Sequence, residues 1–270
     1  MINPNLSPGK VKFYDFILNM LPVLKVGKVN RMIARNEHLS GVPFVKSLCD
    51  EAGIFVNVTG IENLPKKGPV TIVANHPGGA DVLGTIIGLG AVRPDLGVLA
   101  NKLICVDQIK DLVIPIDMMA KVKVDPEMIR EAYRRNKVVV FFAAGKNSRY
   151  NNDGLLRDRR WRTSFLDFAS EFNTPIHVMR INGANTPLFY KVSKFRSRYK
   201  SLKNVPLENM FQLRELLNGK GTVQMFLSKA VSFPPSLKPE NISDIQFKRK
   251  KADILHDFVY RMDENNLEFK

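Results

Sequence analysis

Short β-prone runs that alternate with helical segments constrain the fold of this chain more than any other feature. The most continuous run is residues 137–142, where valines lead into Phe141 and Phe142. Such residues fit a pleated, buried strand, and comparable runs span residues 55–59, 70–74, 96–100, 112–116, 176–181 and 222–227. Strands that alternate with helices favour an α/β fold, with a mixed, largely parallel central sheet flanked by helices.

Helix signals lie between these runs. Asp125-Pro126-Glu127 predicts a helix to about residue 135, because an aspartate cap, a proline at the first position and an early acid favour a helix N-terminus. Residues 161–172 place aromatic side chains on one helical face, which we interpret as core rather than a ligand site. Further helices are predicted to open at residues 80–88 and, after a proline-containing linker, to close the chain at about residues 245–262.

The size of the chain allows one sizeable core, or one core with an appendage, because 44% of its 270 residues are apolar. We divide it into an N-terminal amphipathic helical segment (1–45), an α/β domain (46–235) and a C-terminal helix (236–270). The net charge of +15 favours an anionic partner: nucleic acid, an anionic membrane or an acidic protein. Cys49 and Cys105 lack metal-like spacing and are predicted to be thiols in a reducing compartment.

Residues 10–35 carry an apolar stripe flanked by basic residues. The stripe recurs at helical spacing and consists of Phe13, Phe16, Ile17, Met20, Leu21 and Leu24. A basic amphipathic helix of this kind can lie in a membrane interface, or its stripe can pack on the main domain, with a kink at Pro22. Because we find neither a signal peptide nor an apolar stretch long enough to span a bilayer, we expect a peripheral protein on the cytoplasmic face of the membrane.

The strongest candidate site follows the run at residues 70–74. His76 lies at the carboxyl end of that strand, and Asp81 follows it across a Pro-Gly-Gly turn, in the first turn of the next helix. Open α/β sheets bind their ligands at this edge. A carboxylate bonded to one imidazole nitrogen fixes the tautomer and makes the other nitrogen a better base. The alternative is a structural histidine that a local carboxylate satisfies.

Four blocks of sequence occur in a characteristic order. They are residues 75–81 (Asn-His-Pro-Gly-Gly-Ala-Asp), 99–103 with 112–117, 140–149 (Val-Phe-Phe-Ala-Ala-Gly-Lys-Asn-Ser-Arg), and 174–178 with 183–185. In this order they resemble the glycerolipid acyltransferases, the family of 1-acylglycerol-3-phosphate acyltransferase, and most closely its hemolysin-like branch, which includes lyso-ornithine lipid acyltransferases. The glycerol-phosphate branch has Pro and Glu where this chain has Ala143 and Ala144, and Ala144 fits the hemolysin-like branch. Lys146 replaces a residue that is often acidic there, so these departures concern the acceptor rather than the base.

The resemblance implies transfer of a fatty acyl group from a thioester, on acyl carrier protein or coenzyme A, to a lysolipid hydroxyl. It implies His76 as the general base, Asp81 as the residue that orients it, no cofactor and no metal. The implied acceptor is a lyso-aminolipid of the ornithine or glycine type, or 1-acylglycerol-3-phosphate. Substrate-binding residues are expected in the same blocks: Asn75, Gly79, Lys102, Gly145, Ser148, Arg149 and Asn185.

The third block offers two kinds of ligand contact. Backbone amides in its small-residue turn (143–145), or at the helix start near Asp81, can face a developing oxyanion. Taken alone, Arg149 is a solvated loop charge. With the resemblance, we expect Arg149 to hold the acceptor's anionic head, since an arginine binds phosphate or carboxylate with two parallel hydrogen bonds.

Two other functional classes stay open at this point. Basic clusters at residues 157–162 and 191–203, the latter interleaved with aromatics, are compatible with a nucleic-acid-binding module in which His76 and Asp81 are structural, although no known nucleic-acid motif is present. A thioesterase would use water in place of the lysolipid. His177, inside an apolar strand, is predicted to be a core residue, and no spacing of His and Cys residues indicates a metal site.

Overall fold

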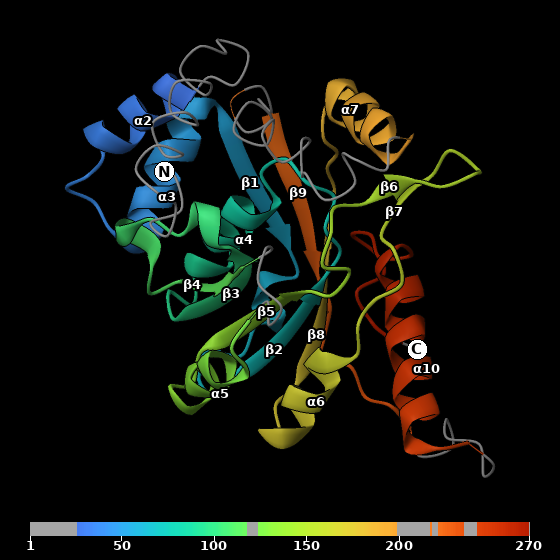
Figure 1. Ribbon diagram of the computed structural model, residues 1–270. Coiled ribbons are helices and arrows are strands. Elements are labelled where there is room, and N and C mark those ends of the chain that lie inside the picture. Colours follow the sequence, from blue (N-terminus) through green and yellow to red (C-terminus); the bar gives the residue numbers. More distant parts are fainter. Residues whose placement is uncertain (1–25, 118–123, 199–216, 218–220, 235–241, 270) are drawn as a thin grey trace.

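The computed structural model describes residues 26–117, 124–198, 217, 221–234 and 242–269 (Figure 1). At its centre lies a seven-stranded sheet in the order β1-β9-β8-β2-β5-β3-β4. Neighbouring strands are parallel except β8 and β9, so β1 and β9 run against the others, and the predicted mixed, largely parallel sheet is confirmed. The strands are β1 (Ile54–Thr59), β2 (Val70–Ala74), β3 (Leu96–Asn101), β4 (Val113–Ile116), β5 (Val138–Phe142), β8 (Ile176–Ile181) and β9 (Gly221–Leu227).

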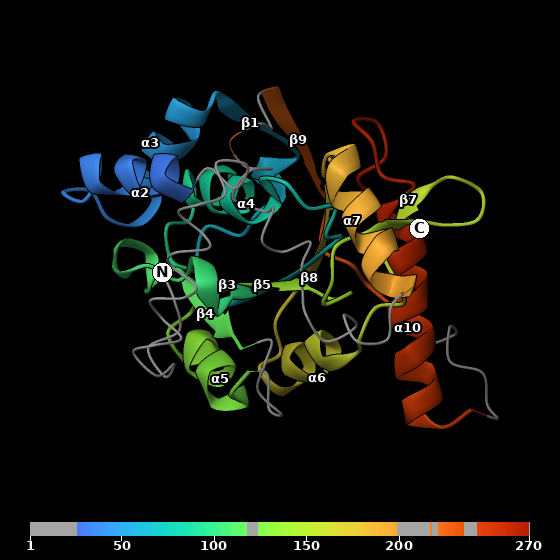
Figure 2. The same cartoon turned by 45° about the horizontal axis from the view of Figure 1, so that its top comes forward.

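Helices cover both faces of the sheet, and Figure 2 shows the two helical layers with strands between them. One layer contains α2 (Val26–Arg35), α3 (Gly41–Ala52) and α4 (Asp81–Gly90), and the other contains α5 (Pro126–Arg134), α6 (Ser164–Glu171) and α10 (Asp244–Val259). Alternate residues of β5 enter opposite cores: Val138 and Val140 face the first layer, and Val139 and Phe141 face the second. A sheet buried on both sides therefore explains the continuous apolar runs.

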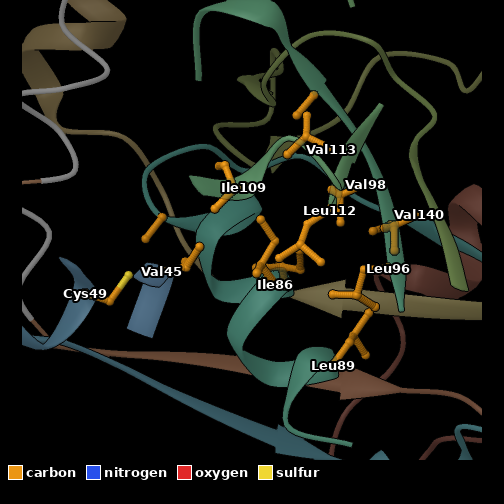
Figure 3. Close-up of a cluster of buried hydrophobic side chains, with 14 of the residues drawn as sticks. Val45, Cys49, Ile86, Leu89, Leu96, Val98, Ile109, Leu112, Val113 and Val140 are labelled. Atoms are coloured by element: carbon orange, nitrogen blue, oxygen red, sulfur yellow. The ribbon is translucent and has the colours of Figure 1, made fainter. Parts of the chain in front are cut away.

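The core on the α3–α4 side is mainly aliphatic (Figure 3). Ile86 and Leu89 of α4 lie over Leu96, Val98 and Val140 of the sheet, and all five are fully buried. The neighbouring α3 contributes Val45 and Cys49 to the same cluster. Both cysteines of the chain are free thiols, and burial raises the pKa of Cys49 to about 12, so this thiol behaves as a small apolar core residue.

Some elements differ from the prediction. The helix predicted from residue 161 begins at Ser164. Trp161 belongs to the loop before the helix, where its indole donates to the buried carboxylate of Asp158. The hairpin of β6 (Arg149–Tyr150) and β7 (Leu156–Arg157) was not predicted, nor was α7 (Pro187–Arg198), which contains part of the basic stretch 191–203. Short 3-10 turns complete the fold as η2 (Ile61–Asn63), η3 (Lys102–Ile104) and η4 (Asp107–Ile109).

The N-terminal prediction is only partly within the described structure. The apolar stripe between Phe13 and Leu24, and its kink at Pro22, lie outside the described residues. In α2, Val29 and Met32 are buried against the core, so this part of the segment packs on the main domain. Within the ranges that the structure describes, no helix is long and apolar enough to cross a membrane.

Candidate active site

The turn between β2 and α4 brings His76 and Asp81 together. Gly78 and Gly79 have φ angles of 97° and 67°, in the left-handed region that favours glycine. A Cβ on Gly78 would lie 2.0 Å from Nδ2 of Asn185, so this turn also requires a residue without a side chain. The two glycines therefore let the chain reverse tightly, and Asp81 returns to the imidazole from the first turn of α4.

The His76–Asp81 pair is a short, well-supported hydrogen bond. Nδ1 of His76 lies 2.7 Å from Oδ2 of Asp81, whose side chain is only 3% exposed. The backbone N–H groups of Gly78 and Val82 donate to Oδ2 and Oδ1 of the same carboxylate, both at 2.7 Å. Because an ionised carboxylate only accepts, Nδ1 carries the proton of the neutral imidazole and Nε2 keeps its lone pair in that form.

The electrostatic surroundings of His76 favour its protonated form. Burial alone would lower its pKa, but the charge of Asp81 and its hydrogen bond raise it, and the charge of Asp158 raises it further. Arg149 opposes them weakly, and the net result is a pKa above the ordinary 6.5. With its side chain still 18% exposed, His76 combines a supported imidazole with access from outside.

A second buried carboxylate, Asp158, contacts the backbone of the histidine. The backbone N–H of His76 donates to both of its oxygens at 3.2 Å, and the hydroxyl of Ser148 donates to Oδ1 at 2.5 Å. The indole of Trp161 donates to Oδ2 at 2.9 Å, and the backbone N–H of Asp158 donates to the hydroxyl of Tyr260 just after α10. Asp158 thus joins the end of β2, the third block and the C-terminal helix.

Sequence reasoning missed this residue. In the sequence, Asp158 is one acid among the arginines of residues 157–162, and the basic cluster is the more prominent signal. Two of its hydrogen-bond partners, the N–H of His76 and the hydroxyl of Tyr260, are 82 and 102 positions away, so local pattern carried little signal. The one sequence clue was a single acid followed three residues later by the only tryptophan.

The third block forms a loop that wraps around His76. The N–H of Ser148 donates to the carbonyl of His76 at 2.7 Å, and the ring of Phe142 lies 4.6 Å from the imidazole, centre to centre. Nδ2 of Asn147 lies 3.5 Å from Nε2 of His76. Ser148, predicted to bind substrate, is instead buried and turned toward Asp158.

Arg149 lies beside this loop and is firmly held. Its Nη1 donates to the carbonyls of Asn147 and Ser148, both at 3.0 Å, and its Nε donates to Ser193 of α7 at 3.1 Å. The guanidinium also stacks over Phe189, 4.9 Å from the ring centre. It is a half-buried cation rather than the solvated loop charge that the residue alone suggested.

The other predicted substrate-binding residues fall into two groups. Asn75 and Asn185 are buried supports: Asn75 exchanges two hydrogen bonds with the backbone of Ile181, and Asn185 accepts from the N–H of Gly79 at 2.8 Å. The amide of Gly79 is therefore already engaged. Lys102 is exposed at the start of η3, after β3, which β5 separates from β2.

Gly145 and its turn also have a local structural role. Gly145 has a φ of 64°, its N–H donates to the carbonyl of Phe142 at 2.9 Å, and the side chain of Arg162 lies over it. The N–H groups of Gly78, Gly79 and Gly145 are thus all bonded within the protein. Across the part of the chain that the structure describes, no cluster of three or more His, Cys, Asp or Glu side chains could hold a metal ion.

A cavity of about 220 Å³ adjoins the glycine turn. It lies between the turn at residues 78–81, the segment after β8 and the first residues of β9. Its walls include the glycine turn, Asp81, Ile181 and Val223. The site beside it offers a partly exposed base, a carboxylate that orients it and a nearby fixed cation.

The chain is similar in sequence to known proteins. Residues 55–182 match the acyltransferase family, a span that includes β1 through β8 and every residue of the site up to Asn182. Over 197 residues, 69% of this chain and 71% of the relative, the sequence is 29% identical to the lyso-glycine lipid O-acyltransferase of Bacteroides thetaiotaomicron. It is 28% identical over 187 residues to the protein of the same description from Phocaeicola vulgatus, covering 66% of this chain and 65% of that one.

A solved structure is also similar. The 1-acyl-sn-glycerophosphate acyltransferase of Thermotoga maritima aligns over 91% of this chain and 92% of its own, with 16% identity and a TM-score of 0.43. The sequence matches make the chain similar to the acyltransferase family and support an acyltransferase activity.

Proposed function

We propose that this enzyme is a lysolipid O-acyltransferase that acylates the free hydroxyl of a lyso-glycine lipid. The observation that carries the proposal is the orientation of His76: Asp81 holds Nδ1 at 2.7 Å, which leaves Nε2 to accept a proton. The acceptor class is supported by the two relatives described as lyso-glycine lipid O-acyltransferases. The donor is an acyl thioester, on acyl carrier protein or coenzyme A.

The reaction needs one proton transfer in each direction. Nε2 of His76 takes the proton of the acceptor hydroxyl as its oxygen attacks the thioester carbonyl. The tetrahedral intermediate then expels the thiolate, the carbon–sulfur bond breaks, and the imidazolium returns the proton to sulfur. Asp81 stabilises the imidazolium between these steps. No covalent enzyme intermediate forms, because the acceptor hydroxyl is itself the nucleophile.

Arg149 is proposed to bind the acceptor's anionic head. Its charge lies close enough to His76 to lower the pKa of the imidazole, and its contacts to backbone carbonyls and Ser193 keep it in place. A glycine-type lysolipid presents a carboxylate, and 1-acylglycerol-3-phosphate presents a phosphate; a guanidinium accepts either. A fixed cation next to the base would place the acceptor hydroxyl at a constant distance from Nε2.

We also propose that the enzyme acts at the surface of an anionic membrane, where its amphiphilic acceptor resides. The net charge of +15 favours such a surface. Near the site, α7 exposes Lys191, Lys194, Arg198 and the ring of Phe195. Co-sedimentation with anionic vesicles at low salt, reversed at high salt, is the expected behaviour. Failure to pellet at low salt would contradict it.

Acyl transfer is tested with purified protein and defined substrates. Lyso-glycine lipid, lyso-ornithine lipid and 1-acylglycerol-3-phosphate are each offered with acyl-carrier-protein and coenzyme A thioesters, and products are measured by mass spectrometry. We expect the diacyl glycine lipid to form fastest. Preferential formation of phosphatidic acid would show that the preferred acceptor is 1-acylglycerol-3-phosphate. Release of free fatty acid alone would make the enzyme a thioesterase, and neither product would contradict the proposal.

A further inference from the structure

We infer that the side-chain amide of Asn147 is the oxyanion donor of this site. This inference rests on the proposed acyl transfer. When a hydroxyl attacks a thioester, the carbonyl oxygen gains negative charge, and a positioned N–H donor stabilises it more than it stabilises the ground state. The residues around His76 therefore have to supply such a donor on the side of the imidazole from which the substrate approaches.

Asn147 lies on that side. Its Nδ2 is 3.5 Å from Nε2 of His76, whereas Asp81 occupies the opposite ring nitrogen. The attacking hydroxyl must lie within hydrogen-bond distance of Nε2, and the carbonyl that it attacks is one bond further away. An N–H group that already reaches Nε2 is therefore within reach of the carbonyl oxygen in the transition state.

Several backbone amides near His76 are used elsewhere. Four of them donate within the protein: Gly78 to Asp81, Gly79 to Asn185, Gly145 to the carbonyl of Phe142, and Ser148 to the carbonyl of His76. Of the side chains in the described part of the chain, Asn147 is the one that reaches Nε2.

The loop holds Asn147 before substrate arrives. The following residue, Ser148, is anchored through its N–H to the carbonyl of His76 and through its hydroxyl to Asp158. The carbonyl of Asn147 accepts from Arg149 at 3.0 Å, and Asn147 as a whole is only 6% exposed. A donor fixed in this way needs little reorganisation during the reaction, which is what electrostatic stabilisation requires.

The distance itself distinguishes this role from a purely structural one. A contact of 3.5 Å is long for a hydrogen bond, so a substrate hydroxyl displaces it at little cost. If the contact only capped the lone pair of Nε2, removing it would shift the titration of His76 and leave the maximal rate unchanged. If Asn147 binds the oxyanion, removing it lowers the maximal rate and leaves the titration nearly unchanged.

The test compares Asn147→Ala with Asn147→Ser, which retains a short donor, and with Asn57→Ala as a control on the exposed face of β1. Wild-type activity is measured first. For Asn147→Ala we expect kcat to fall by roughly 10²–10³-fold, with both KM values and the pH midpoint nearly unchanged. Asn147→Ser is expected to recover part of the loss, and Asn57→Ala to match the wild type. Thermal melts confirm that each variant is folded.

Three results would overturn the inference. Full activity of folded Asn147→Ala would show that the amide is not needed. A rise in acceptor KM alone would make Asn147 a binding residue, and a shifted pH midpoint with an unchanged plateau would make it a cap on the base. An inactive wild type would instead contradict the proposed function, so the two failures are distinguishable.

Discussion

His177 lies in β8 and His76 follows β2, the neighbouring parallel strand, and the surroundings of the two histidines differ in nearly every respect. His177 lies inside β8, opposite Ile72 of β2, and is 2% exposed. Its Nδ1 contacts the carbonyl of Ser228 at 2.9 Å, and its Nε2 has no hydrogen-bond partner among the residues described. His76 lies just beyond the end of β2, with a carboxylate on one nitrogen and an accessible second nitrogen.

The difference shows how a strand end converts a histidine into a usable base. Burial lowers the pKa of His177, and a backbone carbonyl compensates only in part. For His76, burial also lowers the pKa, but the carboxylates of Asp81 and Asp158 together more than offset it and the pKa rises. A neutral imidazole sealed in a core has no substrate to act on, whereas at the carboxyl edge of the sheet the free nitrogen faces a ligand.

The largest expected effect comes from removing the base itself. His76→Ala is predicted to lower kcat by at least roughly 10²–10⁴-fold, because the acceptor hydroxyl loses its proton acceptor. The fold should persist, since the side chain is partly exposed and Asp158 holds the backbone of residue 76 rather than the ring. Steady-state kinetics and a thermal melt check both parts. A folded His76→Ala enzyme with nearly full activity would contradict the proposed mechanism.

The contact between His76 and Asp81 was predictable because it is local. A histidine after a buried strand, a Pro-Gly-Gly turn and a carboxylate in the first turn of a helix define nearly all of the geometry. The strands were predictable for a related reason: a sheet covered on both faces requires continuous apolar runs, and β2 and β8 have the predicted bounds.

What could not be predicted depends on long-range contacts or weak local signals. The N-cap residue of α3, Ser40, makes no side-chain cap hydrogen bond, so α3 is fixed by burial of residues such as Phe44 and Cys49 rather than by a start signal. In α7, basic and aromatic residues suggested a charged surface, and its buried positions, Phe189 and Ser193, only became evident beside Arg149.

Asp81→Asn is expected to have the next largest effect, about 10²-fold on kcat, the lower end of the range for acid–base catalysis. Its second consequence makes His76 more like His177. With the charge of Asp81 removed, burial and Arg149 lower the pKa of His76 and only Asp158 still raises it, so the pKa falls. Because only neutral His76 accepts a proton, the rising limb of the pH–rate profile should shift to lower pH. An unshifted limb would contradict this account of the pKa.

Arg149→Ala is expected to act mainly on the acceptor. Losing a charge-assisted contact worth about 1.5–3 kcal/mol would raise the acceptor KM by roughly 10–100-fold, with little change in the donor KM. Because Arg149 lowers the pKa of His76, the same variant should move the rising limb of the pH profile to higher pH. Initial-rate kinetics with each substrate varied separately measure both. A raised donor KM with an unchanged acceptor KM would assign Arg149 to the thioester.

The smallest effect on activity is expected for His177→Asn, which retains an N–H donor for the carbonyl of Ser228 but does not titrate. Burial lowers the pKa of His177 below 6.5 in the folded state, so the unfolded chain binds the proton more readily. The contribution of His177 to stability is therefore complete above pH 6.5 and is lost as the pH falls from there through the folded-state pKa. The loss is about 1.4 kcal/mol for each pH unit between the unfolded-state and folded-state pKa values.

Denaturant unfolding at about pH 7.5 and 5.5, on either side of the ordinary histidine pKa, measures this effect. The free energy of unfolding should fall less between the two pH values in His177→Asn than in the wild type, although replacing the ring lowers stability at both. His38→Asn, at an exposed position, is the control. If the free energy of unfolding falls equally at acid pH in all three proteins, His177 does not titrate on unfolding. A large loss of acyl transfer in folded His177→Asn would contradict the assignment of His177 to the core and His76 to catalysis.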